Sequence, residues 1–136
     1  MVRAARDLGR RAVVLRGWAD LSPPDDGPDC LSIGEVNQQA LFRRVAAVVH
    51  HGGAGTTTAA AQAGTPQVVI PQHTDQHYWA HRVHTLGIGI PHPPTDSLTT
   101  SLERALEPQV AARAGDVAGE VRTDGARVAA ERLPAG

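Results

Sequence analysis

The sequence predicts an α/β protein, a Rossmann-like parallel sheet of about five strands with helices on both faces. Short apolar runs alternate with segments that have the spacing of helices, and Gly or Pro separates the two kinds of segment. The 136 residues are 41% apolar and 20% charged, which is the size and composition of one globular domain. We therefore treat residues 1–136 as one domain.

Five apolar runs predict the strands. Each run is only a few residues long, and glycine, proline or polar residues close it. The run over 46–49 leads directly into His50 and a glycine turn, and Pro71 ends the next strand. The predicted strands cover residues 12–16, 31–33, 46–50, 67–70 and 88–90.

The helices are predicted from apolar spacing and from their end signals. Leu41, Phe42 and Val45 stand at helical spacing, and Gly64 and Gly87 follow the segments that they end. A helix of small residues follows the glycine turn, so it is expected to lie close to its sheet. Tyr78 and Trp79 are expected to pack the next helix on the sheet. The predicted helices cover residues 1–8, 38–45, 56–63, 76–86, 96–106, 109–122 and 124–133.

The order of the elements is unusual at its start. The chain opens on a helix, whereas a doubly wound domain usually begins with a strand. We therefore expect the first strand of the fold to be missing, either because the sequence is a fragment or because it starts inside a longer ancestral domain.

Composition excludes several classes of function. A formal net charge of −1 gives no electrostatic reason to expect nucleic acid or an anionic membrane as a partner. The single cysteine, Cys30, excludes an internal disulfide and a cysteine-rich metal site, which fits a reducing compartment. No apolar run approaches the ~20 residues of a membrane span, and the N-terminus is charged rather than signal-like. A cytoplasmic location follows as the expectation.

The turn after the third strand is the most informative segment. It begins with His51, and Gly53, Ala54, Gly55 and Thr56 lead into the helix. A strand that ends in glycines and opens a helix leaves backbone N–H groups unpaired at the positive end of that helix. Such an end binds phosphate, and His51 adds a side-chain donor.

Three kinds of phosphate ligand fit a glycine turn. A P-loop requires a Lys followed by Ser or Thr, and no Lys is near. A dinucleotide site would use Gly53, Gly55 and a later acid such as Asp75, but Thr58 occupies the third glycine position and Asp75 lies beyond the strand tip. A nucleotide-sugar diphosphate fits best, because amides, a helix dipole and imidazole stabilise its leaving group without a metal.

The sugar is expected at the next strand-to-helix loop. Asp75 can accept two hydrogen bonds from sugar hydroxyls, and Gln76 can both donate and accept. Both loops follow sequential strands, so both open at the carboxyl edge of the sheet, where ligands bind in this class of fold.

These motifs together resemble a known family. The segments 51–56, 64–66 and 75–76 resemble the donor-binding signature of nucleotide-sugar-dependent glycosyltransferases with the GT-B fold. The variant is similar to enzymes that glycosylate vancomycin-type peptides and, more distantly, to sterol and plant glucosyltransferases. The likeness extends through 16–18, 35–48 and 123–125, and covers nearly the whole chain.

The resemblance implies a role for each position of the signature. Asp75 and Gln76 would bind hydroxyls of the transferred sugar, and Trp18 with the Val36 main chain would cradle the base. Plant members carry a glutamate that grips the ribose where this chain has Ala59, so a dTDP donor is as plausible as a UDP donor. The groups implied to hold the diphosphate are His51, Gly53, Ala54, Gly55 and Thr56.

The resemblance also implies what the chain lacks. Family enzymes have a separate N-terminal domain that binds the acceptor and usually supplies the catalytic base. The expected function is thus the donor-binding part of an inverting, metal-independent hexosyltransferase that acts on a hydroxyl of a small natural product. The alternative is a non-catalytic nucleotide-sugar-binding fragment, or a subunit that needs a separate acceptor-domain partner. We expect the isolated chain to be inactive or weakly active.

Two further alternatives concern other residues. His77, His81 and His84 share one face of a helix and could chelate zinc, although a solvated face is the simpler interpretation. The second alternative is that the chain is a nicotinamide-binding domain of an oxidoreductase. His50 is expected to end its strand half buried, in a structural role.

Overall fold

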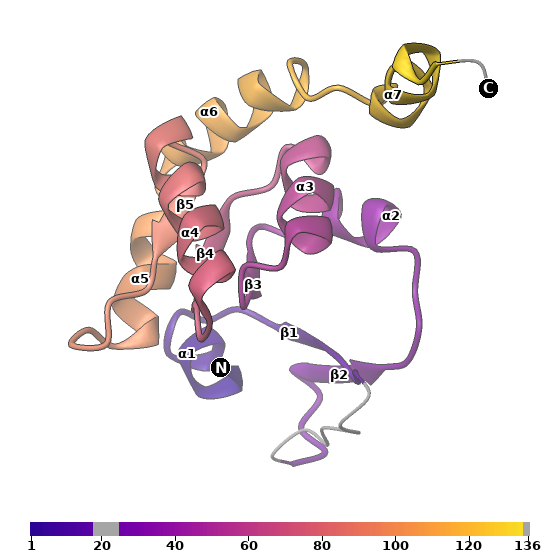
Figure 1. Cartoon of the computed structure of the whole chain (residues 1–136). Coiled ribbons are helices and arrows are strands. Elements are labelled where there is room, and N and C mark those ends of the chain that lie inside the picture. The colour runs from indigo at the N-terminus through magenta and orange to yellow at the C-terminus, as the bar shows by residue number, and fades with distance from the viewer. Residues whose placement is uncertain (18–24, 135–136) are drawn as a thin grey trace.

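The computed structural model describes residues 1–17 and 25–134, and strands alternate with helices along them (Figure 1). Trp18 lies outside the described residues. The elements are, in order, α1 (Val2–Asp7), β1 (Ala12–Leu15), β2 (Cys30–Ile33), α2 (Gln38–Phe42), β3 (Val48–His50), α3 (Ala54–Ala63), β4 (Gln67–Val69), α4 (Thr74–Leu86), β5 (Gly89–Pro91), α5 (Leu98–Ala105), α6 (Pro108–Ala118) and α7 (Gly125–Arg132).

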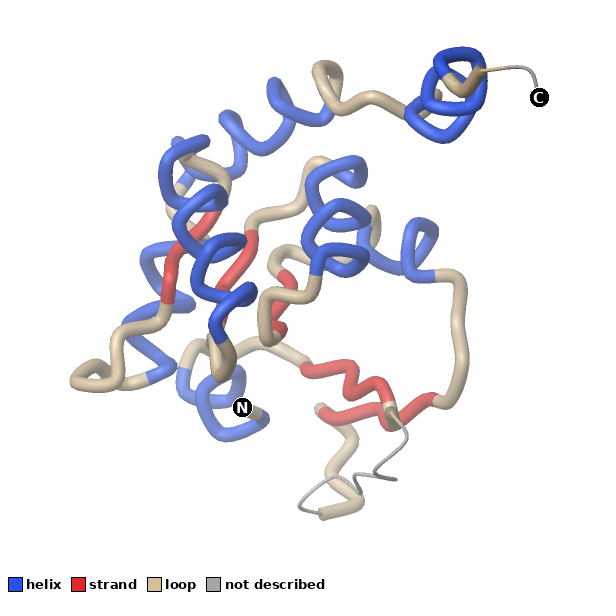
Figure 2. The backbone as a smooth tube through the Cα atoms, viewed as in Figure 1, coloured by secondary structure: helices blue, strands red, loops and turns tan. Residues whose placement is uncertain are grey.

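The five strands at the predicted positions are all parallel, which confirms the fold class. They form two hydrogen-bonded sheets where the sequence predicted one: β1 pairs with β2, and β3, β4 and β5 form the second sheet (Figure 2). In the doubly wound strand order 3-2-1-4-5-6, the first strand lies between the second and the fourth. The described residues supply no strand for that place between β1 and β3, so the two halves do not join.

Helices cover both faces of the three-stranded sheet, as predicted. Val68 packs among buried residues of α1 and α5, such as Ala4 and Leu102. The next residue, Val69, packs on the other face with Val83 of α4 and Val117 of α6. The alternation of neighbouring side chains along β4 therefore builds two apolar layers with the sheet between them.

The two helices that carry the predicted site residues begin earlier than predicted. The α3 helix begins at Ala54, directly after the glycines, where the sequence predicted a start at Thr56. The α4 helix begins at Thr74, where the sequence predicted Gln76. Helix ends carry little apolar signal, so spacing alone places them poorly. These starts matter because they put the predicted site residues into the first turns of α3 and α4.

One predicted packing contact is wrong. Tyr78 is 57% exposed, although it was expected to pack α4 on the sheet. Its ring meets Trp79 edge to face, with 5.1 Å between the ring centroids. The helix packs through the smaller buried residues Ala80 and Val83, because these lie on the inward face.

Candidate functional site

The turn between β3 and α3 leaves backbone donors at a helix end. Gly53 is the N-cap of α3, and no side chain caps the helix there. The first helical hydrogen bond runs from the Thr57 N–H to the Gly53 carbonyl at 3.0 Å. The amides of Ala54, Gly55 and Thr56 precede that bond, so they have no partner within the helix. They form the electropositive end that the sequence predicted.

Gly52 brings this turn against the next loop. Its φ of +95° lies in the left-handed region. A Cβ at this position would stand 2.9 Å from Val69 Cγ1 and 3.0 Å from the Gln76 carbonyl oxygen. Only glycine allows both the backbone conformation and this approach. The glycine turn thus lies beside the first turn of α4, and the structure brings together the two predicted loops.

His51 and Thr56 differ in exposure. The His51 side chain is exposed, and the Thr56 side chain is half buried in the first turn of α3. The neighbouring Thr57, which the sequence analysis did not single out, is buried and donates its hydroxyl to the Gly53 carbonyl at 2.7 Å. Thr57 therefore holds the turn from its buried side, and the His51 side chain reaches solvent.

The two predicted sugar-binding residues differ in what they offer. Asp75 is exposed in the first turn of α4. Gln76 Oε1 accepts hydrogen bonds from the backbone N–H of Gln72 at 2.7 Å and of His73 at 3.1 Å. Its carbonyl oxygen therefore closes the start of α4. The amide nitrogen, which makes no hydrogen bond within the described part of the chain, is the group that Gln76 can offer to a ligand.

His50 is half buried at the end of β3, as predicted, but the sequence analysis missed the polar network that it joins behind the turn. His50 Nδ1 accepts from the Gly52 N–H at 2.9 Å, and His50 Nε2 lies 2.7 Å from Gln67 Oε1. The Gln67 Nε2 donates to the Thr57 carbonyl at 3.2 Å. The signal that could have found it is Gln67 itself, a polar residue at the head of an apolar strand.

Burial lowers the pKa of His50, and the proximity of His51 lowers it further, while the hydrogen bond to Gln67 works in the opposite direction. The predominant cause is desolvation of the charged form. The ring is therefore neutral near pH 7. Because the Gly52 N–H can only donate, Nδ1 must accept, and the proton of the neutral ring lies on Nε2.

Val36 is the remaining predicted site residue that the structure describes. Val36 is exposed in the loop between β2 and α2. Among residues 1–17 and 25–134, no group of three or more His, Cys, Asp and Glu side chains is arranged to hold a metal ion. The zinc alternative for the α4 histidines therefore has no support. No described helix has the length and apolar character that a membrane crossing requires.

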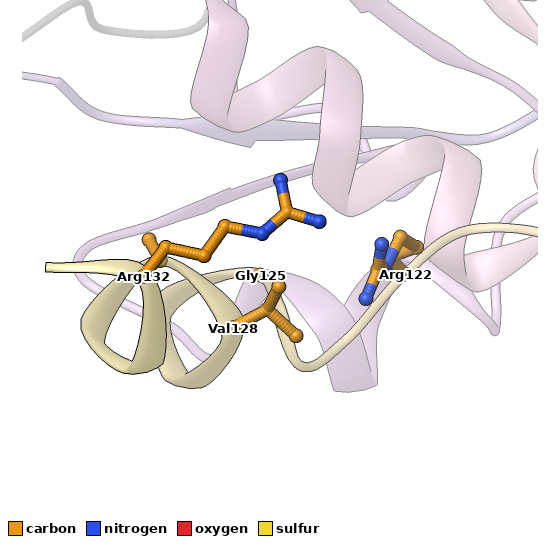
Figure 3. A pocket seen from close by; sticks show the side chains of 5 residues that line it. Arg122, Gly125, Val128 and Arg132 are labelled. Atoms are coloured by element: carbon orange, nitrogen blue, oxygen red, sulfur yellow. The ribbon is translucent and has the colours of Figure 1, made fainter.

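Two surface hollows lie elsewhere. One, of about 390 Å³, is formed around α7 by Arg122, Gly125, Val128, Ala129 and Arg132 (Figure 3). The second, of about 340 Å³, is lined by Gln39, Arg43, Gln62, Ala63, Ala118 and Thr123. Neither hollow includes a predicted site residue. We place the candidate site at the glycine turn nevertheless, because Gly52 holds the free amides of α3 beside the first turn of α4, which carries Asp75 and Gln76.

The comparison with protein families shows to which family the chain belongs. Residues 25–134 match the family described as erythromycin biosynthesis protein CIII-like, C-terminal domain. The chain belongs to this family. Its membership confirms the resemblance that the signature motifs indicated.

Relatives of this EryCIII-like C-terminal domain are glycosyltransferases. The chain is 58% identical over 136 residues to vancomycin aglycone glucosyltransferase of Amycolatopsis orientalis, a match that covers 97% of the chain and 33% of the relative. It is 51% identical over 124 residues to dTDP-epi-vancosaminyltransferase of the same organism, covering 85% of the chain and 31% of the relative. The chain thus spans about a third of the length of these curated relatives.

Solved structures agree with the family. The glycotransferase of kitacinnamycin matches with a TM-score of 0.79 at 26% identity, over 98% of this chain and 38% of that one. The glycosyltransferase VinC, solved in complex with dTDP, matches with a TM-score of 0.74 at 30% identity, over 97% of this chain and 37% of that one. The EryCIII-like chain is therefore a glycosyltransferase C-terminal domain of the GT-B kind, related to those of glycopeptide antibiotic enzymes.

Proposed function

We propose that the chain is the donor-binding part of an inverting glycosyltransferase, which moves a sugar from UDP or dTDP to a hydroxyl of a small natural product. The observation that carries the proposal is the uncapped N-terminus of α3, held by Gly52 against the first turn of α4. The diphosphate would lie on the α3 end and the sugar against α4.

The chemistry of the α3 end suits a departing diphosphate. Negative charge grows on the diphosphate as the bond between sugar and oxygen breaks. The amides of Ala54, Gly55 and Thr56, the helix dipole and the exposed His51 would stabilise that charge, and no metal is required. The Gly53 amide lies at the same end and would complete the set of donors. A base on another domain would take the proton from the acceptor hydroxyl.

Asp75 and the amide nitrogen of Gln76 would bind hydroxyls of the transferred sugar. Asp75 is exposed, so it meets a ligand without rearrangement of the fold. The nucleobase of the donor would contact Trp18 and the Val36 main chain, as the family resemblance implies. The solved complex of VinC with dTDP supports a thymidine donor. The Ala59 position, which lacks a carboxylate for the ribose, is compatible with either nucleotide.

The alternative is a nucleotide-sugar-binding chain that transfers nothing without a separate acceptor-domain partner. The chain spans about a third of the length of its curated relatives. Adding a purified acceptor domain of a relative distinguishes the two: transfer that appears only in the mixture supports the split arrangement. A cytoplasmic location, predicted from the single cysteine and the charged N-terminus, belongs to the same proposal.

Calorimetric titration of the chain with dTDP, UDP, their glucose conjugates and NADH tests the proposed function. We expect saturable binding of at least one nucleoside diphosphate and none of NADH. The His51→Ala variant should lose about 1.5–3 kcal/mol of diphosphate affinity, because it removes a hydrogen bond to a charged group. His84→Ala, which changes an exposed histidine at the far end of α4, is the control.

Two results would argue against these assignments. Diphosphate affinity that is the same in wild type and in His51→Ala would remove His51 from the site. Asp75→Ala should weaken binding of the nucleotide sugar much more than binding of the free diphosphate. Equal losses for both ligands would exclude Asp75 from the sugar site.

A further inference from the structure

We propose that His50 is a positioning residue, which sets the conformation of the glycine turn by connecting the Gly52 amide to the buried side chain of Gln67. The choice of a nucleoside diphosphate as the affected ligand rests on the proposed function. The connection itself is a property of the fold and is tested separately below.

The hydrogen bonds run in one direction. The Gly52 N–H donates to His50 Nδ1 at 2.9 Å, and the His50 Nε2–H donates to Gln67 Oε1 over 2.7 Å. The Gln67 Nε2 donates to the Thr57 carbonyl at 3.2 Å. The chain of bonds begins in the turn and ends in the first turn of α3. It therefore fastens the residues that flank the proposed phosphate site from both sides.

The network cannot be replaced by solvent. Gln67 and Thr57 are 0% and 5% exposed, so water does not reach the Gln67 amide. A buried amide without hydrogen bonds is costly, and His50 together with the Thr57 carbonyl meets its needs. An apolar side chain of similar length would fill the same space in β4. The polar group of Gln67 is thus explained by what it holds in place.

The consequence for a ligand is preorganisation. Gly52 donates its own N–H to His50, so this amide does not bind phosphate. Its left-handed conformation, kept by that bond, would fix the direction in which the chain enters α3 and so the positions of the following amides. Loss of the connection should therefore weaken ligands that contain a diphosphate and leave ligands without phosphate unchanged.

Four variants of the full chain separate the parts of the connection. In His50→Asn, the side-chain oxygen can still accept from the Gly52 amide. In His50→Phe, the ring volume is kept and both hydrogen bonds are lost, and in Gln67→Met the partner of His50 is removed. His92→Phe is the matched control, since His92 is a part-buried histidine whose ring is bonded to Ser101 at 2.9 Å and not to the glycine turn.

The binding test compares dTDP and UDP with thymidine and uridine by calorimetry. We expect His50→Phe to weaken diphosphate binding about tenfold, because the hydrogen bond that orders Gly52 is lost, with nucleoside binding unchanged. His50→Asn should restore most of the affinity, and His92→Phe should bind as wild type does. Unchanged diphosphate affinity in His50→Phe, or an equal loss for nucleosides, overturns the proposal.

Nitrogen NMR tests the connection without any ligand. The His50 ring should carry its proton on Nε2, and exchange of the Gly52 amide hydrogen should accelerate in His50→Phe and Gln67→Met. A proton on Nδ1, or Gly52 exchange that is the same in all variants, overturns the proposal. If the wild-type chain binds no diphosphate, the proposed function fails, and these two NMR results alone decide whether His50 sets the turn.

Discussion

At the scale of single residues, the site depends on backbone positions more than on side chains. Gly52 and Gly53 are neighbours with opposite requirements. Gly52 has φ +95° and no room for a Cβ, whereas Gly53 has φ −63° and open space around it. A motif of two glycines therefore contains one residue that the fold requires and one that it tolerates changing.

This contrast gives a residue-scale prediction. Gly52→Ala should lower the free energy of unfolding by at least about 1–2 kcal/mol, the cost of a left-handed non-glycine residue, with the contact to Val69 in addition. Gly53→Ala should lower it by only about 0.5 kcal/mol, because alanine is a poorer N-cap than glycine but has room here. Urea unfolding of both variants measures the difference. Equal stabilities for the two would contradict the described conformation of the turn.

At the scale of elements, the helix starts differ in how they satisfy their amides. Asn37 caps α2 through the Ala40 N–H at 3.1 Å, and Ser97 caps α5 through the Thr100 N–H at 3.1 Å. The α3 start has Gly53 instead and no side-chain cap. Side-chain caps and ligands compete for the same donors, so the uncapped start of α3 leaves its donors free for an anion.

Gly53→Ser tests this competition. The backbone at this position has the extended conformation of an N-cap, and a serine side chain would accept from an amide of the first turn. We expect stability to stay level or rise by about a few tenths of a kcal/mol, while diphosphate affinity falls about tenfold or more. Calorimetry and thermal unfolding measure the two effects. A variant that binds as tightly as wild type would place the diphosphate elsewhere.

At the scale of the whole molecule, long-range polar contacts tie α1 to the segment before β2. The Arg6 guanidinium hydrogen-bonds both carboxylate oxygens of Asp29, at 2.6 and 2.7 Å, and of Asp25, at 2.8 and 2.7 Å. These bonds lower the pKa of Asp25 to about 2 and also lower that of Asp29.

At the opposite end of the chain, α7 buries no residue and stands apart from the rest of the molecule in Figure 1.

The Arg6 contacts predict a pH dependence of stability. Both carboxylates have a lower pKa in the folded chain than the ordinary value of 3.8. The ion pairs therefore stabilise the fold above about pH 4, and their contribution is lost as pH falls toward about 2. The difference in melting temperature between wild type and Arg6→Met should shrink over that range. Added salt should also reduce it, because the groups are partly exposed to solvent.

Arg127→Met is the matched control for this prediction. Arg127 pairs with Asp124 at 3.1 Å and with Glu131 at 2.5 Å, all on the exposed α7. Its loss should leave the melting temperature unchanged at every pH, because α7 contributes no buried surface to the core. A larger effect from Arg127→Met than from Arg6→Met would contradict the described role of the α1 contacts.

Local patterns were enough to predict the strands, the parallel fold class and the glycine turn. Apolar runs and glycines determine local structure over a few residues, so the sequence alone is enough to predict what they form. The family resemblance of the turn and of Asp75 and Gln76 was also available from residue order, and the family match confirms it. The roles of His51, Asp75 and Gln76 toward a ligand remain predictions.

Tertiary structure decided the rest, because it depends on which distant residues become neighbours. The parallel register of β3 and β4 places Val48 opposite Gln67, which brings His50 and Gln67 within hydrogen-bonding distance across 17 positions of sequence. No local pattern encodes that pairing. The split into two sheets has the same origin, since strand order is set by the partners available in space. The residue types thus specified each element, and packing between the elements decided how the turn is held.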